Sequence, residues 1–567
     1  MKKINYIIFA ICMITAASCS KSFLDKNPQG ELIVPQLTTQ DGVEATLTGA
    51  YGLLNGNTNG TWGNYGAAPS QWLLGEVTSD NAHKGSENGD QPNMNLLERH
   101  APTSTNDNLE NLWNRCFEGI LRCNNTLKIL ALVQGTDKKF PDARAKEITA
   151  EARLLRAHYN FFLVRAFKNV PLITEATTEP AVDNMKDIYP AIVEDLKFAV
   201  ANLTPAFPKG QIGRVNQIAA KAYLGKVYLY QKKYLDALPL FNDVMASRPG
   251  IETIPYTDNF DVTKENGPEA VFAVQNSVGT DGSGGDNGNV GDMLNFPYNS
   301  SLPITCCGFF QPSIDLANSF KVTAAGLPYL DGSYTTNPYV SDRGVADKAG
   351  YKLDVTIPLD PRIDYTMGRR GVPFSDWGTM AGDAWIRDAS NGGPFLALKN
   401  VVKASEISGF TAPGNTNITA LNINIIRLAD VYLMAAECEV EAGSLPNALA
   451  LVNRIRDRAS KLPKKQVGGV DVAAYRVSPY LTFPDQAYGR NAVRFERRME
   501  LSLEGHRFYD LVRWGILKQR MSDYFTFEGG YFNYLKGIVL ADKDEYFPIP
   551  QTQIDRSKGI LKQNLGY

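Results

Sequence analysis

Three pairs of oppositely charged residues stand three positions apart near the C-terminus of the sequence, and they could serve acid–base catalysis or structural ion pairing. The pairs are Arg497 with Glu500, Arg507 with Asp510, and Asp510 with Arg513. On a helix, side chains at this spacing face each other and can neutralise one another. Apolar residues interleave with them, which favours a position beside the core, where paired arginines are expected. We therefore predict structural ion pairs here rather than a catalytic site.

A second group of residues suited to chemistry consists of aromatic side chains in stretches rich in glycine and asparagine. Trp and Tyr rings can cover the apolar C–H faces of sugars, while Asn, Asp or Arg side chains hold the hydroxyl groups. Trp377 and Trp385, beside Gly378 and Gly382, are the first candidates. The other candidate ligand contacts are Trp62, Tyr65, Tyr298, Tyr334 and, from a polar stretch without aromatic residues, Asn81 and His83. For each ring, a core residue that anchors a loop is the alternative interpretation.

Histidine and acidic residues give no pattern that is typical of a metal or catalytic site. Neither zinc-ligand spacing nor a Gly-x-Ser-x-Gly motif is present, and the stretch Asp281–Asp292 does not have the spacing of an EF-hand. His158 and His506 are interpreted as core histidines, whereas His83 and His100 flank a polar stretch and are expected to be freer. A glycosidase needs only two carboxylates at a suitable distance, and the sequence selects no such pair. We expect no catalytic residue, no metal and no cofactor.

The N-terminus has the pattern of an export signal. Residues 1–18 combine a basic start, a short apolar run and small residues. Cys19 follows directly, which looks like a bacterial lipobox, although Ala16 replaces the usual leucine. We predict that the thiol of Cys19 carries a lipid and becomes the first residue of the mature chain; a plain secretory signal is the alternative. Removal of the signal takes away two lysines and no acid, so the formal net charge changes from −2 to −4.

The five cysteines beyond the lipobox are expected to be free thiols. Cys116 and Cys123 are seven residues apart in a helical pattern, about 10 Å along the helix axis, which is too far for a disulfide. Cys306 and Cys307 are adjacent, and two free thiols are preferred over a strained vicinal disulfide. Cys438 lies in an apolar helical pattern and is interpreted as a core residue.

The composition describes a large, near-neutral globular protein. The chain has 567 residues, of which 44% are hydrophobic and 21% charged, values that are ordinary for a folded protein in water. The small net charge argues against a nucleic-acid partner. After the signal, no apolar stretch is long enough to span a membrane, so contact with a membrane is expected through the lipid alone.

Helical periodicity dominates the first half of the mature chain. In residues 147–170, apolar side chains recur at spacings of four and three, which predicts one helix that ends before Pro171. Residues 185–203 and 214–248 continue the pattern. The last of these segments has the spacing of a tetratricopeptide repeat, although Lys221 stands at the tryptophan position. The residues that fit the repeat are Leu224, Gly225, Tyr228, Ala237, Phe241 and Pro249.

The small residues of this repeat recur later in the chain. Gly225 and Ala237 are twelve residues apart and would let two antiparallel helices approach closely. Ala436 and Ala448 have the same separation. Two such pairs predict a scaffold of helical hairpins. The predicted organisation is one composite unit with these parts: a signal (1–18), a lipidated N-terminus and tether (19–45), a helical part (46–250), a loop-rich ligand-binding insertion (251–420) and a C-terminal helical part (421–567).

Four separated blocks resemble a single family. The blocks are Cys19 with Phe23-Leu24-Asp25, residues 150–157 (AEARLLRA), residues 426–433 (IRLADVYL), and residues 494–501 (RFERRMEL) followed by 504–515 (EGHRFYDLVRWG). Together with the endings FPIP at 547–550 and QNLGY at 563–567, they resemble the SusD/RagB family of outer-membrane nutrient-binding lipoproteins. The sequence departs from the family pattern at Leu565, where proline is usual, and at residues 20–22, where early acids are usual.

The resemblance implies a mostly α-helical, SusD-like fold, with tetratricopeptide-like hairpins and a loop-rich ligand-binding half that contains short strands. It also implies a non-catalytic protein that is lipid-anchored in the outer membrane, faces the cell surface, and sits as a lid over a TonB-dependent (SusC-like) transporter. The implied ligand is an oligosaccharide. The RagB branch takes up peptides, so a peptide-binding lipoprotein is the alternative, and a helical glycoside hydrolase is the third hypothesis.

Overall fold

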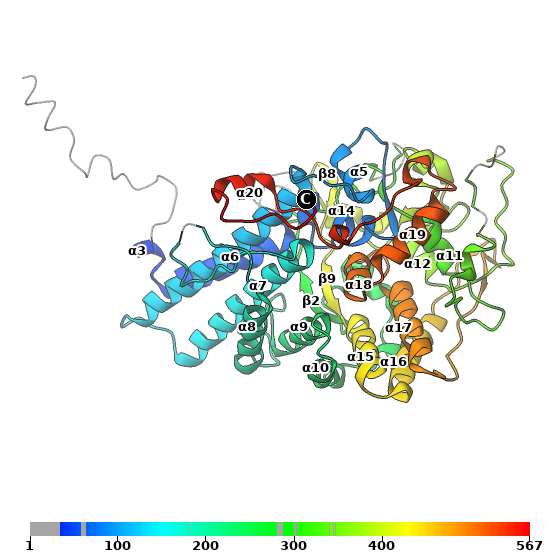
Figure 1. Cartoon of the computed structure of the whole chain (residues 1–567). Helices are drawn as coiled ribbons and strands as arrows, with labels where there is room; N and C mark the ends of the chain where they lie inside the picture. Colours follow the sequence, from blue (N-terminus) through cyan, green and yellow to red (C-terminus); the bar gives the residue numbers. More distant parts are fainter. Residues whose placement is uncertain are drawn as a thin grey trace, which may run out of the picture.

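The computed structural model describes residues 34–57, 64–179, 181–279, 287–299, 302, 304–339, 341–343, 345 and 348–567. Cys19 and Trp62 lie outside these ranges, as does the first half of the Asp281–Asp292 stretch. The described chain is mostly helical, with two helical blocks and a loop-rich region between them in sequence (Figure 1). The predicted fold class is confirmed. A search of this part of the chain finds no helix with the length and apolar character to cross a membrane.

The first helical block begins earlier than predicted. Helix α4 starts at Gln40, inside the segment expected to be a tether, because the Thr39 hydroxyl accepts the N–H of Gly42 at 3.0 Å and caps the helix. Helix α7 ends at Phe167, before Pro171, as the periodicity predicts. The helices of this block are α3 (Val34–Leu37), α4 (Gln40–Gly52), α5 (Pro92–Glu98), α6 (Asp107–Gln134), α7 (Asp142–Phe167), α8 (Tyr189–Asn202), α9 (Gln217–Tyr230) and α10 (Tyr234–Ala246).

The two predicted helical hairpins are present and lie side by side. Helices α9 and α10 form the first, and α15 (Leu428–Ala442) and α16 (Leu445–Ser460) form the second, with α10 packed on α15 (Figure 1). A Cβ atom on Gly225 would lie 2.6 Å from the ring of Phe241, so glycine is required for this close approach. Ala436 and Ala448 are completely buried at the equivalent contact. The small residues thus set the helix spacing in both pairs.

Short strands connect the loop-rich region to the helices. Each sheet has two strands, and all pairs are antiparallel except β4 with β12. Strand β9 runs directly into α15, so its pairing with β2 ties the loop-rich region to the second hairpin. The pairs are β1 (Ala82–Gly85) with β3 (Phe309–Pro312), β2 (Ala270–Val274) with β9 (Ile423–Arg427), β4 (Pro358–Leu359) with β12 (Ala474–Tyr475), β5 (Met367–Gly368) with β6 (Leu396–Ala397), β7 (Thr411–Ala412) with β8 (Asn415–Thr419), and β10 (Gln466–Val467) with β11 (Val470–Asp471).

The remaining helices complete the second block, and the C-terminal segment returns to the first. The N–H of Phe547 donates to the carbonyl of Ala166 at 2.8 Å, and the side-chain amide of Asn564 donates to the carbonyl of Phe167 at 2.7 Å. The C-terminal segment therefore joins the two blocks, in addition to the packing of α10 on α15. The helices of the loop-rich region and the second block, besides α15 and α16, are α11 (Ile314–Ser319), α12 (Ile363–Thr366), α13 (Ala389–Gly392), α14 (Ile407–Phe410), α17 (Gln486–Leu501), α18 (Arg507–Arg513), α19 (Leu517–Glu528) and α20 (Gln551–Arg556).

The charged residues near the C-terminus form buried ion pairs, but with other partners than predicted. Arg497 contacts Asp430 and Asp510, each at 2.6 Å, instead of a neighbour on its own helix. Of the three predicted pairs, Asp510 with Arg513 is formed, at 2.9 Å. The pairing of Arg497 with Glu500 is wrong because the carboxylates of other elements are closer to the guanidinium.

Glu500 shows why local spacing could not identify the partners. Its carboxylate is fully buried and contacts Arg458 at 2.6 Å, Arg427 at 2.8 Å and Arg362 at 3.1 Å, three residues from three other segments. Burial raises the pKa of Glu500, but the three positive charges outweigh it and hold that pKa well below its usual range. Arg507 likewise pairs with Asp80 at 2.7 Å and not with Asp510. The charged residues near the C-terminus therefore join the helices to the loops.

The cysteines differ from the prediction at one place. Cys306 and Cys307, which are adjacent in the chain just before β3, form a disulfide, so the prediction of two free thiols is wrong. The other described cysteines are free and buried, as predicted: Cys116, Cys123 and Cys438.

Candidate functional site

Tyr298 is the only exposed aromatic side chain in the part of the chain that the structure describes. Its exposed fraction is 43%. The N–H of Tyr298 donates to the carbonyl of Trp385 at 2.8 Å, which fixes the backbone beneath the ring. The guanidinium carbon of Arg387 lies 5.0 Å from the ring centre, within the range of a cation–π contact. The ring is therefore held in one place while much of it faces solvent.

Arg387 joins the tyrosine to a polar loop. Its guanidinium donates to Asp90 at 2.6 Å, to Glu87 at 2.7 Å and to the hydroxyl of Ser86 at 3.1 Å. These charge-assisted bonds fix the plane of the guanidinium and so its position against Tyr298. We call Tyr298, Arg387 and residues 86–90 the exposed face, in which Ser86 itself is fully buried and supports Arg387. Its oxygen and nitrogen atoms lie beside an aromatic ring, which is the combination that a sugar requires.

The loop at residues 86–90 is positioned by strand β1 and the turn that follows it. Lys84, in β1, donates to the carbonyl oxygens of Glu87 at 2.7 Å and Asp90 at 2.6 Å. Burial lowers the pKa of Lys84 to about 8. The side-chain amide of Asn391 donates to the carbonyl of Gly85 at 2.9 Å. The loop is therefore bonded from both sides and does not depend on a ligand for its shape.

Gly308 leaves room for the side chains of Tyr298 and Arg387 next to the backbone. Its φ is +78°, and a Cβ atom there would lie 3.3 Å from Cβ of Arg387 and 3.4 Å from Cβ of Tyr298. The disulfide between Cys306 and Cys307 directly precedes it. A side chain at position 308 would strain the backbone and press on both residues of the exposed face.

Tyr65 lies near the same loop. It is half-buried, and burial together with the negative charge of Asp90 raises the pKa of its phenol. Thus the structure brings two of the predicted aromatic residues, Tyr65 and Tyr298, to the region of Asp90. The prediction for Trp62 lies outside the described residues.

Trp385 has a structural position, which corrects its prediction as a direct ligand contact. It is 7% exposed and packs against Phe374 with a ring-centre distance of 5.8 Å and an interplanar angle of 81°. Trp377 is half-buried at the edge of the same apolar cluster, and its indole N–H donates to the carbonyl of Val402 at 2.9 Å. Both tryptophans therefore anchor the loops that carry Arg387, and Trp377 keeps a partly open edge.

Asn81 and Tyr334 are also interior residues, so their predicted contact with ligand is wrong. Asn81 is fully buried and Tyr334 is 4% exposed. Arg498 donates to the amide oxygen of Asn81 at 2.9 Å and to the hydroxyl of Tyr334 at 3.1 Å. A polar residue in a loop-rich stretch is thus buried because an arginine of α17 supplies its hydrogen bonds.

His83 and His100 are buried, contrary to the expectation that they are freer. His83 Nδ1 lies 2.9 Å from Glu98 Oε1, and its Nε2 lies 3.5 Å from Glu528 Oε2. Burial lowers the pKa of His83, but the carboxylates of Glu528 and Glu98 outweigh it and raise that pKa to about 9. His100 has no such partner, and burial lowers its pKa to about 4. Two further histidines are buried, as predicted: His158 and His506.

Four residues of the exposed face were missed by sequence reasoning: Ser86, Glu87, Asp90 and Arg387. No local pattern distinguishes them, because their contacts span about three hundred residues of the chain. Within the described residues, no group of three or more His, Cys, Asp or Glu side chains could hold a metal ion. The fold and the exposed face together define a helical scaffold protein that presents an exposed tyrosine beside polar groups.

Comparison with protein families identifies the scaffold. Residues 268–567 match the SusD family, and residues 22–229 match a family described as "Starch-binding associating with outer membrane". Because the first match covers more than half of the chain, the protein belongs to the SusD family, which confirms the resemblance seen in the sequence. SusD-like protein P25 of Formosa agariphila is 24% identical over 554 residues, which cover 92% of each chain. A SusD-like protein of Bacteroides ovatus is 24% identical over 96% of this chain and 88% of the relative.

Solved structures share the fold over nearly the whole chain. A laminarin binding SusD-like protein matches with a TM-score of 0.66 and 24% identity, over 93% of this chain and 100% of the other. Surface glycan-binding protein A from Bacteroides thetaiotaomicron, in complex with laminarihexaose, matches with a TM-score of 0.63 and 19% identity, over 93% of this chain and 99% of the other. At these identities the likeness establishes the common fold.

Proposed function

We propose that the protein binds an oligosaccharide at the exposed face and does not cleave it. The observation that carries this proposal is Tyr298, the single exposed aromatic ring in the described part of the chain. A sugar ring can lie on this tyrosine with its apolar C–H face. The oxygens of Glu87 and Asp90 can then accept hydrogen bonds from the sugar hydroxyls, and Arg387 keeps both carboxylates in place.

The relatives support a carbohydrate ligand. Two of the structures that share the fold are described as a laminarin binding protein and a surface glycan-binding protein in complex with laminarihexaose. The family that matches residues 22–229 is described as starch-binding. A sugar that lies on one exposed ring is buried only in part, so we expect modest affinity for the isolated protein.

The place of this binding step is the outer membrane. We propose that the lipid on Cys19 anchors the protein there, facing the cell surface, and that it passes the oligosaccharide to a TonB-dependent, SusC-like transporter. The description of the family at residues 22–229 as associating with the outer membrane supports this location.

A panel of soluble polysaccharides tests the function directly. The purified protein is run through native gels that contain laminarin, starch or other glycans. In parallel, it is incubated with each glycan in solution, and the supernatant is assayed for released reducing sugar. Retardation by a glycan without release of sugar is the expected result. Released sugar would instead favour the hydrolase hypothesis, and retention of peptides with no glycan retained would favour the peptide-binding alternative.

A further inference from the structure

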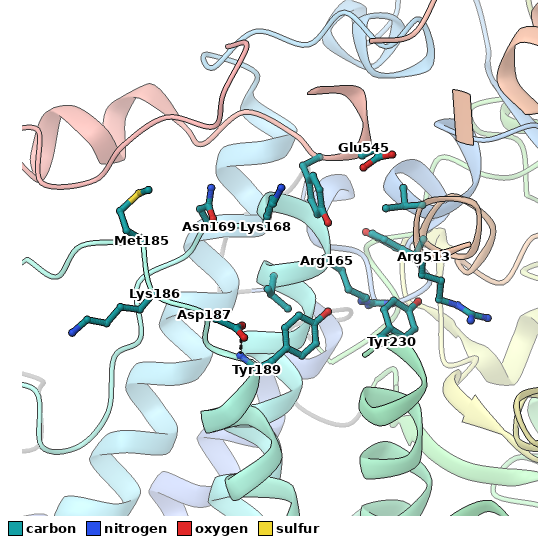
Figure 2. A pocket seen from close by; sticks show the side chains of 14 residues that line it. Arg165, Lys168, Asn169, Met185, Lys186, Asp187, Tyr189, Tyr230, Arg513 and Glu545 are labelled. Atoms are coloured by element: carbon teal, nitrogen blue, oxygen red, sulfur yellow. Dashed lines mark hydrogen bonds between the residues drawn. The ribbon is translucent and has the colours of Figure 1, made fainter. Parts of the chain in front are cut away.

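A cavity of about 470 Å³ lies in the helical part of the protein and shares no residue with the exposed face. Its walls come from the end of α7, the segment before α8, the last residue of α9, and α18. Figure 2 shows Arg165, Tyr230 and Arg513 on one side of the cavity and Met185 and Lys186 on the other. Its volume is in the range of sites for small molecules. Four of the lining residues are tyrosines: Tyr189, Tyr230, Tyr509 and Tyr546.

Arg165 is a buried cation without a countercharge. Its exposed fraction is 7%, and no carboxylate of the described residues lies within ion-pair distance of it. Its Nε atom has no hydrogen-bond partner in the described protein. Its side chain hydrogen-bonds the neutral Tyr230, and the tyrosines around it outweigh burial and raise its pKa, so Arg165 stays charged. An anion that enters the cavity supplies the countercharge that it lacks.

The aromatic residues around Arg165 determine how it can meet an anion. The guanidinium carbon lies 4.3 Å from the ring centre of Tyr509 and 4.7 Å from those of Phe161 and Phe162. The guanidinium therefore lies among aromatic rings, and the N–H groups that do not engage Tyr230 are the ones left for a ligand. In-plane contact is the geometry in which arginine binds a carboxylate.

Arg513, the other arginine of the cavity, is already neutralised. It donates to Glu437 at 2.8 Å and to Asp510 at 2.9 Å. Its guanidinium carbon lies 5.4 Å from the ring centre of Tyr230. Arg513 therefore orients one tyrosine of the wall, and Arg165 remains as the buried charge of the cavity without a carboxylate partner in the described chain.

The outer part of the cavity carries both signs of charge. Lys168 and Lys186 line it and are exposed, and Lys168 Nζ lies 5.1 Å from the ring centre of Tyr546. Asp187 and Glu545 also line it, and Asp187 accepts the backbone N–H of Tyr189 at 2.9 Å (Figure 2). The lysines balance these two carboxylates, which leaves the charge of Arg165 unbalanced.

We propose that this cavity is a second binding site, which takes a sugar acid such as the uronic acid unit of an acidic oligosaccharide. The carboxylate meets the in-plane N–H groups of Arg165, and the sugar ring lies against the tyrosine walls. The volume and the four tyrosines favour a ligand with a ring over a small inorganic anion. The choice of a sugar among ring-bearing carboxylates rests on the proposed function, whereas the carboxylate itself follows from Arg165.

Titration with matched sugars tests this site. D-Galacturonate and D-glucuronate are compared with D-galactose and D-glucose, which lack only the carboxylate, by calorimetry and saturation-transfer NMR. We expect the uronates to bind at least about tenfold more tightly than the neutral sugars, a difference of about 1.4 kcal/mol. Added salt weakens this binding, because it depends on charge.

Variants locate the binding. Arg165→Gln removes the charge but keeps a side chain of similar size, and it is expected to abolish uronate binding. Should this variant not fold, Tyr189→Ala, at a half-buried wall residue, serves in its place and is expected to weaken uronate binding. Lys146→Ala changes an exposed lysine on α7 outside the cavity and serves as the matched control. Tyr298→Ala leaves uronate binding unchanged, which separates this site from the exposed face.

Three results would overturn the proposal. The first is equal affinity for uronates and neutral sugars, and the second is uronate binding that persists in folded Arg165→Gln. The third is binding of an acidic dipeptide, acetyl-Glu-Tyr, without binding of either uronate, which would assign the cavity to a peptide. If the protein does not bind neutral glycans at the exposed face, the proposal for the cavity is not affected.

Discussion

The charge on His83 makes a quantitative prediction about stability. His83 lies in β1, directly before the loop of the exposed face, and its side chain is fully buried between Glu98 and Glu528. Its pKa is about 9 in the folded protein, against about 6.5 for an unperturbed histidine. Since the folded state holds the proton more tightly, the contribution to stability is complete below about pH 6.5 and is lost as the pH rises through about 9.

The size of this effect follows from the shift. A shift of about 2.5 pKa units corresponds to roughly 3 kcal/mol of unfolding free energy. We expect the difference in unfolding free energy between wild type and His83→Gln to shrink by that amount between about pH 6.5 and pH 9.5. Urea denaturation followed by circular dichroism measures it. Taking the difference removes the contribution of other groups that titrate in this range, such as Lys84, whose pKa is about 8.

His100→Gln is the matched control for this experiment. His100 is also buried, but its pKa is lowered to about 4, so it is neutral in the folded and unfolded states above about pH 7. The difference between wild type and His100→Gln should therefore change by less than about 0.5 kcal/mol over the same range. A constant difference for His83→Gln would refute the reasoning, because it would mean that His83 is not a cation in the folded protein.

Three further changes have defined outcomes. Glu500→Gln removes the charge that three buried arginines share and should lower the unfolding free energy by about 3–5 kcal/mol, visible as a large fall in Tm; a loss below about 1 kcal/mol would contradict the buried network. Cys19→Ala should move the protein from the membrane to the soluble fraction, and continued anchoring would exclude the lipid. Gly308→Val should lower glycan affinity at unchanged helical content, since a side chain there presses on Tyr298 and Arg387; native affinity would show that their placement does not matter.

Local patterns were sufficient for the helices and their close contacts. The periodicity of residues 147–170 and the close approach of two helices at Gly225 depend on residues that are near in sequence, and both were predicted correctly. The polarity around Asn81 suggested an open loop, but Arg498 arrives from α17 and buries it. Burial of a polar residue depends on which distant group satisfies it, and a single sequence does not contain that information.

The exposed face was predictable only in part, because only some of its residues carry a local sequence signal. Tyr298 and Tyr65 were selected because aromatic residues in loops are a local signal, and their contact with a ligand stays a prediction. Arg387 was missed, because a single arginine in a loop has no distinguishing neighbours and its partners are Ser86 and Asp90. Trp385 was misassigned, since a tryptophan beside glycines is found both in ligand sites and in small loop cores such as the one it fills.

The most direct test of the central claim is the affinity of Tyr298 variants for the glycan that the panel identifies. Tyr298→Ala removes the ring and is expected to weaken binding at least about tenfold, about 1.4 kcal/mol, whereas Tyr298→Phe keeps the ring and most of the affinity. Tyr234→Ala, at a half-buried tyrosine of α10, should leave binding unchanged. Isothermal titration calorimetry on the three variants and the wild type gives the comparison. Unchanged affinity in Tyr298→Ala would contradict the account, because the glycan would then bind elsewhere on the protein.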